Sequence, residues 1–266
     1  MRLLAAIAAL LIAATFAGSV PARAGIVGAE MKEVEAAPGP DAALPLDLGF
    51  SDETGRALTL RSAIAGVPGV LIFADYTCRT LCGPILEFAT AGLAKTGLRP
   101  GVDYRLVVIG IDPKDKPAMA QAMRAEHIDR ASALDQTARF LIGDDAAVRA
   151  VTRAVGLSYY YDAEHDQYAH PAAVYIVNAG GRVQRVLSPL GLDGADLRLA
   201  LVDAGQGSVG TFADRIHLLC YGYDPVKGMY SERITSMLAV AAALTLVVLL
   251  GGISVMAARE KRRLPS

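Results

Sequence analysis

Runs of apolar residues, some continuous and some spaced three or four apart, divide residues 46–205 into strands and helices. Two continuous runs, 69–76 and 104–111, are typical of strands buried in the middle of a sheet. Apolar residues at helical spacing predict helices over 84–95, 117–128, 144–155 and 193–204. Shorter strands are predicted at 46–50, 57–60, 140–142, 172–177 and 183–187, and a glycine-rich turn joins the last two.

The order of these elements indicates the fold class. Strands that alternate with helices favour a largely parallel sheet covered on both faces, and the last two strands add antiparallel pairing. We therefore predict an α/β fold of the thioredoxin-like type with a central mixed sheet, formed by residues 46–205. In this plan the first buried strand leads into the start of a helix that carries cysteines, and Cys78 and Cys82 lie at that place.

The residues before this domain read as an export signal and a lead-in. Residues 1–24 combine Arg2, an apolar run over 3–17 and the small-residue cleavage pattern Ala22-Arg23-Ala24, which is typical of a cleaved signal peptide. Residues 25–45, rich in Ala, Gly, Pro and Glu, have little content that could form a core. We expect them to form an extended lead-in to the domain.

A second apolar segment, 237–258, contains no charged residue and would reach about 33 Å as a helix, enough to cross a hydrocarbon core. The basic residues that follow it predict that the tail, 259–266, is cytoplasmic. Residues 206–236 would then form a juxtamembrane extension. The expected topology is a single-pass protein of the cell (inner) membrane, with its folded domain facing the periplasm or exterior.

Charge and cysteine content narrow the function classes. The net charge is −1, and apart from the short tail no basic block suggests a nucleic-acid partner. Three cysteines are too few for a disulfide scaffold, and the odd one, Cys220, could be a buried small residue, a free thiol or a transient metal ligand.

Cys78 and Cys82 are the first candidates for chemistry. At a helix N-terminus, backbone N–H groups and the helix dipole lower the pKa of a thiol, and thiolates bind soft metals and exchange disulfides. Four residues of separation can bring both sulfurs to one side, for a shared metal or a disulfide, and a purely structural bridge is the alternative. His170 precedes Pro171, which would hold its ring where a loop enters a strand, either as a ligand or as a capping or surface histidine.

Four sequence blocks in this order resemble the Sco/SenC family of thioredoxin-fold proteins, which serve copper delivery to cytochrome c oxidase. The blocks are FADYTCRTLCGP, IGIDPKDKP, FLIGDDAAVRAVTRAVGLSYYYD and QYAHPAAVYIVNAGGRVQRVL. The resemblance implies that Cys78 and Cys82 are the Cys-x-x-x-Cys pair and that His170 is the distant metal-binding histidine. It also implies a structural or partner-contact role for Asp112 and Pro113, and a copper-binding oxidase subunit as partner.

Two departures from the family pattern affect the proposed site. Many relatives have proline after each cysteine, whereas Arg79 follows the first one here and Gly83 follows the second. A cationic Arg79 would favour thiolate. The segment LLCYGYDPVKGMY, 218–230, resembles an extension of membrane-tailed relatives, and its tyrosines suit either an interfacial belt or a core.

Two sulfurs and one imidazole suit Cu(I), while oxygen-preferring metals are disfavoured and a structural zinc site would normally have a fourth protein ligand. The predicted function is therefore that of a copper metallochaperone, with no catalytic turnover. The alternative is a thiol-disulfide oxidoreductase that uses the same cysteines to reduce those of the oxidase subunit before metal loading. A peroxidase-like thiol enzyme and a structural disulfide are weaker readings.

Overall fold

The computed structural model describes residues 34–78, 82–163, 166–225 and 227–232, together with 242, 244–246, 248–249 and 251–252. The predicted signal peptide, Arg79 and the predicted cytoplasmic tail lie outside these residues.

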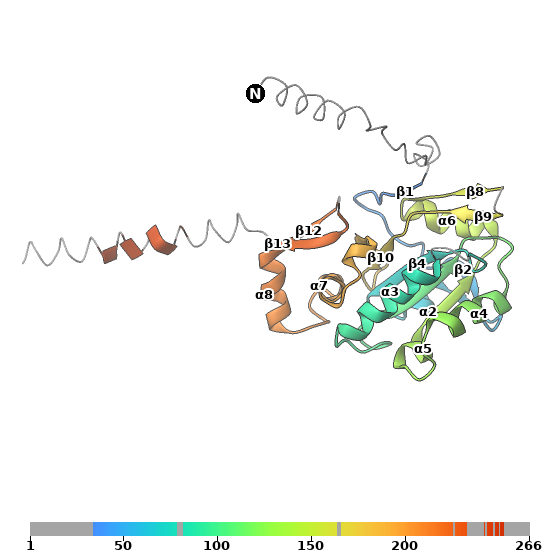
Figure 1. The fold of residues 1–266 in the computed structure, drawn as a ribbon, viewed down its shortest axis with the longest axis horizontal. Coiled ribbons are helices and arrows are strands. Elements are labelled where there is room, and N and C mark those ends of the chain that lie inside the picture. The colour runs from blue at the N-terminus through green and yellow to red at the C-terminus, as the bar shows by residue number, and fades with distance from the viewer. Residues whose placement is uncertain are drawn as a thin grey trace, which may run out of the picture. The chain divides into compact units, whose positions relative to one another are not determined.

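A seven-stranded mixed sheet forms the centre of the domain, with the strand order β11-β10-β4-β5-β6-β2-β3 (Figure 1). Its strands are β2 (Gly49–Asp52), β3 (Ala57–Thr59), β4 (Gly69–Ala74), β5 (Arg105–Gly110), β6 (Arg139–Ile142), β10 (Val174–Val177) and β11 (Val183–Leu187). Only the neighbours β4–β5 and β5–β6 pair in parallel, and the other four neighbouring pairs are antiparallel. The α/β class and the mixed sheet are confirmed, but the expectation of a largely parallel sheet is wrong, because hairpins flank the three parallel strands on both sides.

Helices cover both faces of the sheet. Helices α3 (Cys82–Lys95), α4 (Pro117–His127), α5 (Ala133–Thr137) and α7 (Gly194–Ala204) pack in one hydrophobic cluster, and α2 (Leu60–Ile64) and α6 (Asp145–Ala154) pack in the other. Strand β4 contributes alternate side chains to the two clusters, and all six of its residues are buried. Burial on both faces explains why this strand is apolar without interruption.

Several short elements were not predicted from the apolar pattern. These are α2, α5, η2 (Pro189–Gly191), α8 (Phe212–Cys220), β1 (Glu35–Ala36), β7 (Leu157–Ser158), and the hairpins β8 (Tyr160–Asp162)–β9 (Gln167–Ala169) and β12 (Tyr221–Asp224)–β13 (Met229–Glu232). Helix α2 begins where a strand was expected to end, because Thr59 caps it: the Thr59 hydroxyl accepts a hydrogen bond from Ser62 N, and the Ser62 hydroxyl accepts one from Thr59 N.

The second half of the predicted lead-in belongs to the domain. Strand β1 pairs with β7, Ala37 N donates to Gly156 O at 2.9 Å, and Leu44 is buried in the core. Gly156 has a φ of +68°, and a Cβ there would lie 2.2 Å from Ala37 O. Because backbone pairing rather than apolar content holds much of this segment, its composition gave no sign of its order.

The extension after α7 packs against the sheet edge at β11. Tyr223 hydrogen-bonds with the backbone of Val186, and Tyr230 N donates to Asp196 Oδ2 at 3.1 Å. Tyr230 is 5% exposed and belongs to the larger core cluster. The alternative of an interfacial belt is therefore wrong for Tyr230, which is a core residue.

The predicted membrane segment, 237–258, lies mostly outside the described residues. The described ones are helical and exposed. Within the part of the chain that the structure describes, no helix combines the length and apolar character needed to cross a membrane.

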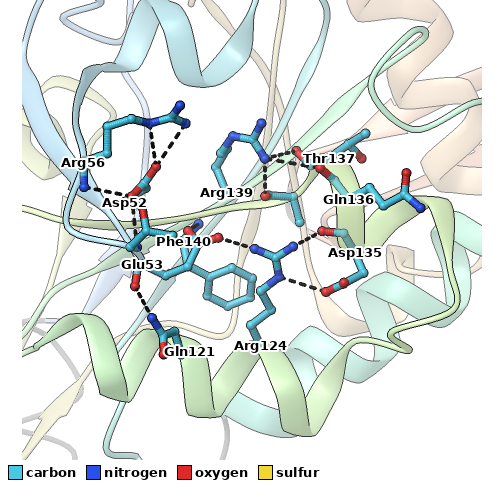
Figure 2. A network of polar contacts seen from close by, with 12 residues as sticks. Asp52, Glu53, Arg56, Gln121, Arg124, Asp135, Gln136, Thr137, Arg139 and Phe140 are labelled. Atoms are coloured by element: carbon cyan, nitrogen blue, oxygen red, sulfur yellow. Dashed lines mark hydrogen bonds and ion pairs between the residues drawn. The ribbon is translucent and has the colours of Figure 1, made fainter.

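A buried polar network joins the β2–β3 turn to α4, α5 and β6 (Figure 2). Arg124 on α4 bridges Glu53 and Asp135: its Nη1 bonds Glu53 Oε1, and its Nε donates to Asp135 Oδ1 at 2.8 Å. Gln121 Nε2 adds a bond of 2.6 Å to Glu53 O. The side chains of Glu53 and Arg124 are only 9% and 21% exposed, so the centre of this network is largely shielded from water.

Candidate metal centre

Cys78 and Cys82 lie where β4 ends and α3 begins, as predicted. Cys78 N donates to Asp75 O at 3.0 Å, which closes a turn after the strand. Tyr76, in that turn, is buried, and its hydroxyl lies 2.9 Å from Leu141 O. Cys82 is the first residue of α3 and is 3% exposed, whereas Cys78 is half-buried. Both are thiols rather than a disulfide in this structure.

His170 reaches the cysteines because β10 pairs with β4. The pairing is antiparallel, with Val174 opposite Ile72, so the residues before β10 lie beside the end of β4. His170 Nε2 lies 3.4 Å from Cys82 Sγ, although 88 residues separate them in the sequence. His170 Nδ1 lies 3.1 Å from Pro171 O. A carbonyl only accepts, so Nδ1 carries the proton and the lone pair of Nε2 faces Cys82.

The ionisation of the site differs from the expectation of two activated thiolates. The sulfur of Cys78 hydrogen-bonds with Cys82 and raises the pKa of the Cys82 thiol, and burial raises that pKa further. This direction is opposite to the expected lowering of the Cys82 pKa at a helix start, because a neighbouring sulfur and desolvation both disfavour the thiolate. Burial lowers the pKa of His170, so its imidazole is neutral at pH 7.

The spacing of Cys82 and His170 suits a shared metal ion. With metal–sulfur and metal–nitrogen bonds of about 2.3 and 2.0 Å, as for zinc, two ligands at a tetrahedral angle lie about 3.5 Å apart. Cys82 and His170 both line a cavity of about 10 Å³, whose other lining residues are mainly apolar, among them Ile72 and Ile85. This volume is about that of one water molecule or ion. Among the described residues, no three His, Cys, Asp or Glu side chains are already grouped as a metal site. Cys82 nevertheless contacts both Cys78 and His170.

Three buried carboxylates, those of Asp75, Asp112 and Asp115, lie near the cysteine turn, and the sequence analysis singled out only Asp112. Asp112 Oδ1 accepts from Lys114 N at 2.8 Å, which supports the predicted structural role of the Asp112-Pro113 pair. Asp115 is 6% exposed, and neither carboxylate oxygen has a hydrogen-bond partner of good geometry. Burial, followed by the charges of Asp75 and Asp112, raises the pKa of Asp115 to about 8. Asp115 is thus mostly protonated and neutral at pH 7, so it adds no third negative charge beside Asp75 and Asp112.

Gly83, one of the departures from the family pattern, has a structural explanation. A Cβ at Gly83 would lie 2.7 Å from Cε1 of the His127 imidazole. His127 Nδ1 also lies 3.0 Å from Glu87 Oε1 on the next turn of α3. The imidazole of α4 therefore occupies the space that a side chain after Cys82 would need.

Comparison with known proteins gives the following similarities. The SCO1/SenC family model matches residues 41–197, and no curated protein sequence matches the chain. The structure of a putative electron transfer protein from Aquifex aeolicus VF5 is similar at a TM-score of 0.55 with 18% identity, over 62% of this chain and 94% of that one. A putative electron transport protein from the same organism is similar at a TM-score of 0.52 with 17% identity, over 62% of this chain and 98% of that one. Arabidopsis thaliana ScoI, solved with copper bound, has a TM-score of 0.46 and 18% identity, over 53% of this chain and 85% of that one.

Proposed function

We propose that this chain, which belongs to the SCO1/SenC family because the family model matches more than half of it, binds copper through Cys78, Cys82 and His170 and delivers it to cytochrome c oxidase. Sco proteins are cytochrome c oxidase assembly proteins. The single observation that carries the proposal for this chain is the contact of 3.4 Å between Cys82 Sγ and His170 Nε2, next to the hydrogen bond between the sulfurs of Cys78 and Cys82.

The donor set suits copper as a cargo. Two sulfurs and a neutral imidazole nitrogen are ligands that Cu(I) prefers, and three ligands leave a position for an incoming ligand of the recipient protein. Because the pKa of Cys82 is raised, that thiol must release its proton when copper binds. Copper loading therefore competes with protons at the sulfur as well as at the imidazole.

The second candidate function is reduction of a disulfide on the oxidase subunit. The adjacent thiols of Cys78 and Cys82 favour it, because they can form one disulfide. The more exposed Cys78, as thiolate, would attack the partner disulfide and form a mixed disulfide. Cys82, on losing its proton, would attack Cys78 Sγ and release the second partner thiolate. The partner gains two electrons and takes up protons to become a dithiol, and this chain is oxidised to the Cys78–Cys82 disulfide.

Metal analysis with X-ray absorption tests the main proposal. The full-length chain, reduced and purified in detergent, is incubated with Cu(I) and passed over a desalting column. We expect about one copper per chain, with both sulfur and nitrogen scatterers at the metal. A chain that retains no copper, yet reduces a model disulfide through the two cysteines, would favour the oxidoreductase.

We further propose that residues 1–24 are a cleaved signal and that 237–258 cross the membrane, with the domain outside and the tail in the cytoplasm. The absence of any charged residue over the 22 residues 237–258, a length that could cross a hydrocarbon core as a helix, supports the second half of this proposal.

Reporter fusions test this topology. A periplasm-dependent reporter such as alkaline phosphatase should be active when fused after Gly205 and inactive when fused after Ser266, because the membrane segment lies between the two positions. A cytoplasm-dependent reporter should give the opposite pattern. Phosphatase activity of the fusion at Ser266 would contradict the proposed orientation.

A further inference from the structure

Asp75 organises the turn that carries Cys78. Its side chain is 0% exposed, and its Oδ1 accepts hydrogen bonds from Thr77 N at 2.8 Å and from Thr77 Oγ1 at 2.7 Å. Its backbone oxygen accepts from Cys78 N at 3.0 Å. These three bonds fold residues 75–78 into an Asx-type turn, which sets the direction in which Cys78 leaves the sheet.

The other oxygen of the same carboxylate faces the segment that carries His170. Asp75 Oδ2 accepts from Tyr168 N at 3.3 Å, across 93 residues of sequence. Tyr168 belongs to β9, which ends one residue before His170. One buried carboxylate is therefore bonded to both chain segments that carry the proposed ligands.

A buried carboxylate is costly unless hydrogen bonds satisfy it, and bonds from backbone N–H groups to a carboxylate are among the stronger ones in proteins. Three donors on two segments satisfy Asp75, whereas the neighbouring Asp115 has none of good geometry. The bonds of Asp75 thus offset its burial only while the two segments keep their present separation.

We propose that Asp75 is a positioning residue that holds the Cys78 turn and the His170 segment together, so that one copper ion can meet both the sulfurs and the imidazole. This inference rests on the proposed function, since it concerns the same three ligands. Asp75 does not touch the metal. Its hydrogen bonds act on the site through Thr77 and Tyr168, and its negative charge also raises the pKa values of Cys82 and His170.

The far end of the β8–β9 hairpin provides a matched control. There Lys114 and Tyr161 both bond Asp166, and these side chains are exposed. Exposed ion pairs contribute little because water and salt screen them. Asp166→Asn therefore changes an aspartate that holds the same hairpin, but at a point where we expect little effect on the site.

The test measures Cu(I) affinity by competition with a chelator, using the full-length chain in detergent. Asp75→Asn keeps the size of the side chain and one acceptor for Thr77, but it presents an amide N–H₂ to Tyr168 N–H. We expect copper affinity to fall about 10- to 100-fold, the usual effect of changing a group that supports a metal ligand. Asp166→Asn should change the affinity by less than about threefold.

A double-mutant cycle with His170→Ala separates positioning from a general effect of charge or stability. If Asp75 acts by placing His170, Asp75→Asn should cost less than about threefold once His170 has been removed. The nitrogen scatterer at copper should also weaken in Asp75→Asn, while both sulfur scatterers remain. An equal loss of affinity with and without His170, or an unchanged nitrogen signal, would overturn the inference.

If Asp75→Asn does not fold, Thr77→Val decides, because it removes only the hydroxyl bond of an exposed residue; we expect about fivefold weaker binding, and unchanged affinity would overturn the inference. If the parent chain binds no copper, the proposed function fails. If the parent binds and His170→Ala is weakened, while Asp75→Asn matches the parent, only the role of Asp75 fails.

Discussion

Replacing Cys82 with serine is expected to abolish both copper binding and disulfide formation, whereas replacing His170 with alanine should weaken only copper binding. Cys82 contacts both other proposed ligands and is the sulfur that pairs with Cys78, so both activities need it. His170→Ala leaves both sulfurs in place and removes the nitrogen. We expect a loss of copper affinity of about 100-fold or more, of the order of 3 kcal/mol.

Chelator competition and a thiol assay of the oxidised protein measure the two activities in the same samples. His217→Ala is the control, because His217 lies exposed on α8. If His170→Ala binds copper as tightly as the control, His170 is not a ligand, and a site with two sulfurs or a simple dithiol reductase is the better account.

The pH dependence of binding gives a second comparison of the same proteins. Burial lowers the pKa of His170, so the imidazole stays neutral at pH values where an exposed histidine, with a pKa of about 6.5, is already protonated. Both proteins should bind less well as pH falls, because the Cys82 thiol must lose its proton in each. Only the parent should show a further decline, and this should begin below about pH 6.5.

Replacing Arg124 with alanine is expected to lower the free energy of unfolding by about 3 to 5 kcal/mol. The substitution removes the cation that joins Glu53 to Asp135 (Figure 2). The Glu53 carboxylate, whose side chain is 9% exposed, would then keep only a long bond of 3.4 Å from Phe140 N. An uncompensated buried charge of this kind explains the size of the expected loss.

Urea unfolding followed by circular dichroism measures this effect, and Arg149→Ala is the matched control. Arg149 pairs with Asp145 on α6, but the two side chains are 55% and 48% exposed, so we expect a loss below about 1 kcal/mol. Equal effects of the two substitutions would mean that the network around Glu53 is accessible to water.

The sequence was a reliable guide wherever a long apolar pattern existed. Strands β4 and β5 and helices α3, α4, α6 and α7 lie within one to two residues of their predicted bounds. Burial of both faces makes the two strands continuously apolar, and burial of one face gives the helices their period of 3.6. The proximity of Cys82 and His170 entered only through a resemblance to a family. No local pattern encodes it, since the pairing of β10 with β4 creates the contact.

Short polar elements escaped prediction for a different reason. In the hairpin β8–β9, tyrosines of the two strands contact one another, with the Tyr161 and Tyr168 rings 5.2 Å apart, but each strand is only three residues long. Asp75 falls within the run 69–76 that was predicted as a strand, and no sequence pattern singled it out. Its significance depends on a backbone N–H 93 residues away, which only the folded chain brings near.

The separation of 88 residues between Cys82 and His170 has a consequence for the lifetime of the protein. In an unfolded chain, bringing the two side chains together would cost the entropy of closing a long loop. An ion that needs both ligands therefore binds the folded chain much more tightly than the unfolded chain. A cargo present at 100 times its dissociation constant then adds about 2.7 kcal/mol to the free energy of unfolding. A loaded chain would resist unfolding and proteolysis, and handing over the ion would return it to a shorter-lived form.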